Sequence, residues 1–147
     1  MLYAEARERL GNRNSRKVAN NTYLVKRSKR SIGLNGDEPI SLRFHSTNIL
    51  TWYPDGCVEY NHGGYTTVTT KNRLNDYGPM GRITQERYKW YIGQPRLEWP
   101  SFTYSLLFSK DGNLIDYDRR YNERGSDPIY HQYHDPRHER LRLYEPP

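Results

Sequence analysis

The chain of 147 residues contains one cysteine, few aliphatic residues and no long apolar run. A single cysteine, Cys57, excludes an internal disulfide and a four-cysteine zinc site. Nowhere does the sequence approach the roughly 20 consecutive apolar residues that a membrane helix needs. Its first residues mix acids with bases, which is not the pattern of a secretory leader. We therefore expect a cytoplasmic protein that does not enter the membrane.

Sequence motifs of common enzyme classes are missing as well. There is no nucleotide-binding glycine loop, no serine elbow and no pair of cysteines at zinc spacing. The sequence therefore gives no positive support for catalysis, and we expect neither catalytic residues nor a cofactor.

Aromatic residues and positive charge are what the chain has instead. Hydrophobic residues make up only 34%, yet there are 14 tyrosines and 3 tryptophans, which must supply much of the core. Aromatic side chains fit a pleated, half-buried surface, so this composition favours a single β-rich domain. The net charge of +6 favours an anionic partner.

Alternation and turn chemistry define the strands. Ile40, Leu42 and Phe44 alternate with polar residues, which predicts a strand with one buried face. The triplet "PDG" at residues 54–56 predicts a tight turn, so residues 48–61 should form a hairpin. The tetrapeptide "KDGN" at residues 110–113 predicts a second hairpin. The predicted fold is mainly β: a small antiparallel sandwich or partly open barrel.

Two short helices and a charged tail complete the expected organisation. One helix should end at Gly11, and another should begin at an N-cap, Thr70, and end at Gly78. The domains expected are a helix and loose basic lead-in at 1–19, a β-rich core at 20–117 and a flexible arm at 118–147. That arm is too poor in aliphatic residues to fold alone.

The arm carries three histidines at helical spacing, which raises the question of a metal site. They are His131, His134 and His138. Pro136 interrupts a helix at this point and the segment lacks a supporting second shell, so no metal site is expected.

The central part of the chain resembles a family of small proteins encoded by bacteriophages and prophages. The resemblance covers about residues 20–93, with Tyr65 where tryptophan is more usual and His62 where a small polar residue is usual. It implies a phage origin, hence the host cytoplasm, and a compact β-rich core, and it supplies no catalytic residues. The matching positions are Arg43, His45, Ser46, Ile49, Asp55, Gly56, Asn61, Gly63, Gly64, Tyr65, Thr67, Thr69, Thr70, Lys71, Arg73, Leu74 and Asn75.

The stretch "HGGYTTVTTKNRLNDY", residues 62–77, contains the first candidate site. Thr67 and Thr69 can lie on one strand face, and Thr70, Lys71 and Arg73 can bind a phosphate at a helix start. The alternative is that the threonines fill an edge strand and Thr70 only caps the helix.

The second candidate pair is Arg43 and His45, expected on one strand face. They can contact phosphate or, with the histidine titrating near neutrality, take part in acid–base work. The alternative is a histidine that locks the corner between two strands.

The third candidate is "RYKWY", residues 87–91. Arg87 and Lys89 can follow a phosphate backbone, while Tyr88 and Trp90, with Tyr65, can stack on bases. Equally, the aromatic face can be core and the basic face solvated.

Together these patterns predict a non-enzymatic phage accessory protein that binds nucleic acid or another phosphate-bearing target. One alternative is an inhibitor or adaptor that docks on a host protein or defence complex. Another is a minor structural component of the virion.

Overall fold

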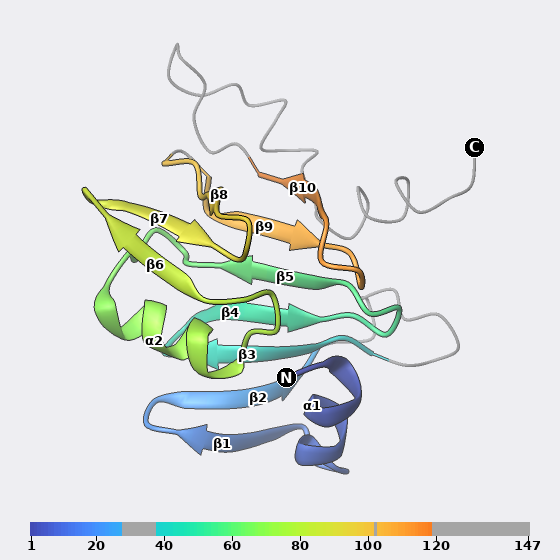
Figure 1. Ribbon diagram of the computed structural model, residues 1–147. Helices are drawn as coiled ribbons and strands as arrows, with labels where there is room; N and C mark the ends of the chain where they lie inside the picture. The colour runs from blue at the N-terminus through green and yellow to red at the C-terminus, as the bar shows by residue number, and fades with distance from the viewer. Residues whose placement is uncertain (28–37, 102, 119–147) are drawn as a thin grey trace.

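The computed structural model describes residues 1–27, 38–101 and 103–118, which form two helices and ten strands (Figure 1). The strands belong to two antiparallel sheets. The mainly β fold with two short helices is thus confirmed, and the large sheet is open rather than closed into a barrel. In chain order the elements are α1 (Tyr3–Leu10), β1 (Ser15–Ala19), β2 (Thr22–Lys26), β3 (Ile40–Phe44), β4 (Thr47–Trp52), β5 (Val58–Asn61), α2 (Val68–Tyr77), β6 (Ile83–Glu86), β7 (Lys89–Ile92), β8 (Leu97–Glu98), β9 (Ser105–Phe108) and β10 (Leu114–Tyr117).

The large sheet has the order β1-β2-β3-β4-β5-β9-β10, and the small one β6-β7-β8. Strand β5 pairs with β9, with Asn61 opposite Ser105, so the chain leaves the large sheet after β5 and returns beside it. The intervening residues 62–104 contain α2 and the whole small sheet. Together with α1 they lie over one face of the large sheet (Figure 1). This insert, residues 62–104, is therefore the second layer of the fold.

Burial on the covered face follows the strand alternation. Leu42 on β3 faces Leu50 on β4, which faces Tyr60 on β5, and all three are completely buried. Leu74 of α2 and Ile92 of the small sheet join the same core. The layers are therefore held together mainly by apolar burial, at about 25 cal/mol for each Å² removed from water.

Both predicted hairpins are present. In the first, the Gly56 N–H donates to the Tyr53 carbonyl at 2.9 Å, and the Asp55 carboxylate accepts from the Cys57 N–H at 3.0 Å. Gly56 has φ +96°, the conformation for which glycine is suited. Cys57 is buried beside Tyr53 and Leu107, in a small apolar cluster apart from the main core.

The segment expected to be a loose lead-in is partly a strand, so that expectation was wrong. Residues Ser15–Ala19 form β1, which pairs with β2 across a turn at Asn21, whose φ is +53°. The strand lies at the edge of the sheet and is largely exposed, so it lacks the apolar alternation that identifies a strand in a sequence.

Most of the predicted arm, including its three histidines, lies outside the described residues. Its first residue, Asp118, is described and buried, and its carboxylate accepts from the N–H groups of Tyr104 and Ser105 at 2.9 and 2.7 Å. Within the described part of the chain, neither α1 nor α2 has the length and apolar character of a membrane-crossing helix.

Candidate ligand site at the start of helix α2

The glycine pair makes a turn that is fixed by its neighbours' side chains. The side-chain Oδ1 of Asn61 accepts from the Gly63 N–H at 2.7 Å, and the His62 Nδ1 accepts from the Gly64 N–H at 3.0 Å. Both glycines have positive φ, +63° and +89°. A Cβ on Gly63 would also lie 2.7 Å from the Thr47 side chain. The turn therefore needs glycine for its backbone angles and for close approach to the β3–β4 turn.

Helix α2 begins one turn earlier than predicted. Its N-cap is Thr67, whose side-chain oxygen accepts from the Thr70 N–H at 3.2 Å while its hydroxyl donates to the Thr70 hydroxyl at 3.0 Å. Thr70 is thus not the cap, and Thr67 and Thr69 do not lie on a strand. The predicted end holds, because the Gly78 N–H closes the helix on the Leu74 carbonyl.

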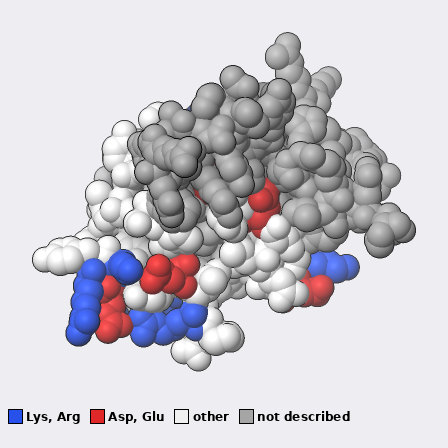
Figure 2. Space-filling view, turned by 90° about the horizontal axis from the view of Figure 1, so that it is seen from above, with Lys and Arg blue, Asp and Glu red and all other residues white. Residues whose placement is uncertain are grey.

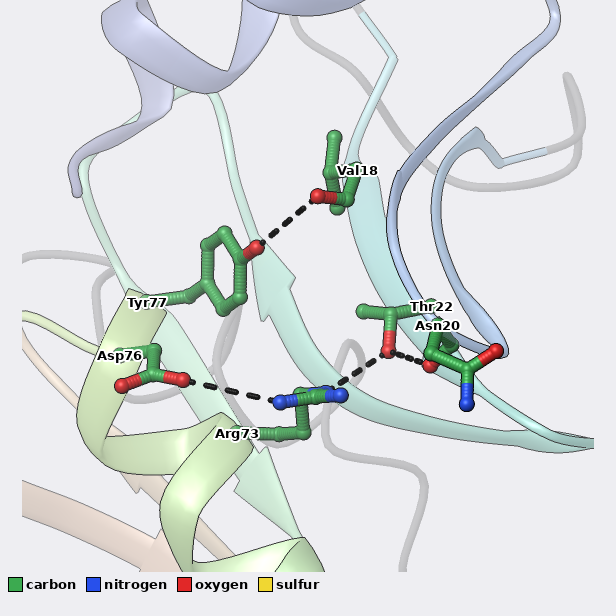
Figure 3. Close-up of polar contacts among 6 residues, drawn as sticks. All are labelled: Val18, Asn20, Thr22, Arg73, Asp76 and Tyr77. Atoms are coloured by element: carbon green, nitrogen blue, oxygen red, sulfur yellow. Dashed lines mark hydrogen bonds and ion pairs between the residues drawn. The ribbon is translucent and has the colours of Figure 1, made fainter.

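Arg73 fastens α2 to the β1–β2 hairpin (Figure 3). Its Nε donates to the Thr22 hydroxyl at 3.0 Å, and its guanidinium lies 3.8 Å from the Asp76 carboxylate. The Tyr77 hydroxyl adds a longer contact of 3.4 Å to the Val18 carbonyl. These bonds position the helix, so Arg73 is better described as a positioning residue than as a free cation.

A cleft of about 450 Å³ opens between the β3–β4 turn and the start of α2. It unites the predicted site residues His45, Tyr65 and Thr70. The described lining contains no Lys, Arg, Asp or Glu, and five of its members are serine or threonine, so we name it the threonine cleft. Its lining residues are Phe44, His45, Ser46, Thr47, Ile49, His62, Tyr65, Thr67, Thr69 and Thr70.

The cleft rests on a cluster of aromatic rings. The His62 ring lies 4.9 Å from Trp99, 5.3 Å from Tyr104 and 5.7 Å from Trp90, measured between centroids. Trp90 is only 4% exposed and belongs to the core. The interpretation of Trp90 as a stacking residue on an open face is therefore corrected: its ring packs beneath His62.

His45 lies in the turn between β3 and β4, with φ +55°, rather than on the strand. Its ring is 4.3 Å from that of Phe44, on the wall of the cleft. Arg43 instead stacks over the Tyr23 ring at 5.3 Å and does not line the cleft. The predicted Arg43–His45 pair on one strand face is therefore wrong.

Residues 87 and 88 form the turn between β6 and β7, and residues 89–91 belong to β7; none of the five lines the cleft. Arg87 and Tyr88 both have positive φ, and Tyr88 is 97% exposed at the tip. Lys89 lies 3.7 Å from Glu98. The cleft thus brings together a member of each sequence candidate, His45, Tyr65 and Thr70, whereas Arg87, Tyr88 and Lys89 do not line it.

The charges of the small sheet are largely compensated by their own neighbours. Besides the Lys89 pair, Arg96 lies 2.9 Å from Glu86 and stacks on Tyr91 at 4.0 Å. Figure 2 shows Lys and Arg side chains beside Asp and Glu side chains on the face it presents. This part of the described surface is therefore not a continuous basic platform.

Lys71 stands in the first turn of α2, partly exposed, without an ion pair to any other described residue. Sequence reasoning missed Phe44, Thr47 and His62 as parts of one site. The available signal was their position inside the two segments that carry the family resemblance.

Two layers, one an open antiparallel sheet and the other an insert with a polar cleft, define a small mainly β protein. A family model, the Kyanoviridae Gp96 protein, matches residues 4–113, which reach from α1 to the turn after β9. The chain belongs to this family of cyanophage proteins, which confirms the phage origin implied by the sequence. No curated protein and no solved structure matches the chain.

Proposed function

We propose that this protein is a non-enzymatic phage accessory protein that binds a phosphate-bearing ligand in the threonine cleft. The observation that carries the proposal is a cleft of about 450 Å³ whose described lining offers hydroxyl and imidazole groups but no carboxylate. A phosphate placed there would meet hydrogen-bond donors without meeting a like charge.

Backbone donors add to the side-chain donors. The first intrahelical bond of α2 runs from the Lys71 N–H to the Thr67 carbonyl at 3.0 Å. The N–H groups of Val68 and Thr69 precede it and have no acceptor among the described residues. Such amides carry the positive end of the helix dipole, which favours an anion. Lys71 adds a full charge within the same turn.

The cleft is held rigid by contacts already described. The Thr67 cap fixes the first turn of α2, the Arg73 bonds fix the helix on the β1–β2 hairpin, and the glycine turn fixes the opposite wall. A site that is ordered before binding avoids part of the entropy cost of ordering it.

Binding rather than catalysis is proposed because acid–base chemistry requires groups of suitable pKa held in mutual reach. The described lining has two imidazoles, of His45 and His62, and no carboxylate to orient either. One of them, His62, is engaged through its Nδ1 in holding the glycine turn.

A direct test uses a labelled oligothymidylate with a 5′-phosphate, followed by fluorescence anisotropy at low salt, with inorganic pyrophosphate as competitor. Lys71→Ala should weaken binding about twofold to fivefold, the effect of one solvent-exposed charge. Lys17→Ala is the matched control, since Lys17 is an exposed lysine on β1, and its affinity should equal that of the unaltered protein. Lack of binding at low salt, or equal losses in the two variants, would overturn the proposal.

The hairpin tip favours a second function, docking on a host protein. Tyr88 is 97% exposed, and exposed tyrosines are frequent anchors of protein interfaces. A stoichiometric host partner that resists nuclease and is lost in Tyr88→Ala, but retained in Tyr65→Ala, would support docking over ligand binding.

A further inference from the structure

The threonine cleft has two walls of different chemistry. The start of α2 supplies hydroxyl groups, from Thr67, Thr69 and Thr70, and the β3–β4 turn with Tyr65 supplies rings, from Phe44, His45 and Tyr65 itself. Inorganic phosphate or pyrophosphate would use only the first wall. The second wall is complementary to a flat, partly apolar group on the same ligand.

Tyr65 is the strongest sign of such a group. It is 63% exposed although it borders a cleft, and the neighbouring Val68 is 62% exposed. Both stand at the same end of α2, and of the two Tyr65 lines the cleft, so its ring offers water-exposed apolar surface there. A planar ring seated against Tyr65 would remove part of this surface from water.

The size of the cleft limits the ligand. About 450 Å³ falls within the range of roughly 300 to 1,000 Å³ typical of small-molecule sites. A paired and stacked base cannot enter such a cleft, because a protein reaches a base face only when the base is unstacked.

From these observations we infer that the cleft accepts a nucleotide with an unpaired base, the base against the rings and the phosphate at the start of α2. This inference rests on the proposed function and names its ligand: a free nucleotide or one nucleotide of a single strand. The hydroxyls of Ser46 and Thr47 can each donate or accept a hydrogen bond. They therefore tolerate different base edges, and we expect less than about tenfold discrimination between bases, as in other stacking sites.

Isothermal titration of the full chain with four probes separates the two proposals. The probes are adenosine 5′-monophosphate, uridine 5′-monophosphate, ribose 5-phosphate and adenosine. We expect both nucleotides to bind at least about tenfold more tightly than ribose 5-phosphate, since stacking of one base is commonly worth that factor or more. Adenosine should bind more weakly than its monophosphate.

Each outcome has a definite reading. Equal binding of the nucleotides and ribose 5-phosphate would overturn the inference on the base and leave the phosphate proposal standing. Adenosine binding as tightly as its monophosphate would overturn the phosphate proposal, and with it the phosphate position in the inference, and would leave only the base against the rings. Absence of binding by all four, or preference for a neutral saccharide added as a fifth probe, would overturn both.

Variants of two exposed tyrosines place the base. Tyr65→Ala should reduce the affinity for the nucleotides to that for ribose 5-phosphate. Tyr88→Ala removes a ring that is 97% exposed at the turn between β6 and β7, and it should leave the affinity for the nucleotides unchanged. Tyr65→Phe keeps the ring and should keep the affinity, which distinguishes stacking from a folding defect. Loss in Tyr88→Ala with no loss in Tyr65→Ala would overturn the assignment to this cleft.

Tryptophan fluorescence gives an independent reading. The Trp99 ring lies 4.9 Å from His62, which lines the cleft, so nucleotide binding should change the emission of Trp99. Trp90 also lies close to His62, at 5.7 Å, so the change should shrink in Trp99→Phe and disappear when Trp90 is replaced by phenylalanine as well, while the affinity persists in titration calorimetry. A change that survives without both tryptophans would place the ligand elsewhere.

Discussion

Gly78 ends helix α2 at a point where the structure has no room for a side chain. Its φ of −80° is open to any residue, so replacement by alanine carries no backbone penalty. A Cβ there would lie 2.6 Å from the Leu74 carbonyl oxygen and would collide with the Tyr60 hydroxyl. Tyr60 is fully buried and its hydroxyl accepts from the Met80 N–H at 2.8 Å, so it cannot move without losing that bond.

The cost of Gly78→Ala follows from these contacts. Overpacking of a core costs about 1–3 kcal/mol, and loss of a buried hydrogen bond about 1–3 kcal/mol. Against this, alanine lowers the entropy of the unfolded chain, a gain of about 0.4–1 kcal/mol. We expect a net loss of about 2–4 kcal/mol in the free energy of unfolding, measured by urea denaturation followed by tryptophan fluorescence.

Gly112→Ala is the comparison that can refute this reasoning. Gly112 has φ +87°, but a Cβ there would meet only the Met80 sulfur, at an ordinary 3.8 Å. Alanine should cost about 1–2 kcal/mol there, from backbone strain alone. An argument from backbone angles only would rank the two substitutions the other way round. A loss at Gly78 equal to or smaller than that at Gly112 would show that the Tyr60 contact is not as tight as described.

Two further outcomes test the fold. Tyr88→Gly should raise the free energy of unfolding by about 1 kcal/mol, because Tyr88 has φ +69° and no packing to lose; an unchanged or lower melting temperature would contradict this. Burial raises the pKa of the Tyr60 hydroxyl well above its usual value near 10, despite the opposing bond from Met80. Since the folded pKa lies above the unfolded one, its contribution to stability is complete below about pH 10 and is lost progressively above it. Tyr60→Phe should therefore be about 1 kcal/mol less stable than the unaltered protein near pH 9, with the gap narrowing toward pH 11; parallel curves would exclude Tyr60 as the source.

Local chemistry explains what could be predicted from the sequence. Hairpin turns such as Pro54-Asp55-Gly56 depend on a few consecutive residues, so they can be predicted without knowledge of the rest of the fold. The N-cap of α2 was misplaced for a related reason. Four threonines lie within residues 66–70, and any of them can cap a helix. Thr67 is the N-cap because the preceding glycine turn sets the position at which the helix can begin.

The features that could not be predicted from the sequence depend on tertiary packing. Alternation in residues 87–91 separates two sets of side chains but does not say which set faces the core, and the insert turns Trp90 inward against His62. The cleft could not be predicted without the sheet topology. Because β3, β4 and β5 run antiparallel, residues 61–70 return to the turn that contains His45. Neither segment alone signals a cleft.

The insert between β5 and β9 both lines the cleft and covers the large sheet, so the cleft and the stability of the domain depend on the same residues. Antiparallel neighbours such as β5 and β9 can be joined by as few as two residues, so the large sheet does not need residues 62–104 for its connectivity. It does need them as a cover, because Leu74, Ile83 and Trp90 shield its apolar face. Substitution of the exposed Tyr65 should therefore cost the fold little, while any deletion that removes the cleft together with the insert also uncovers the apolar face of the large sheet.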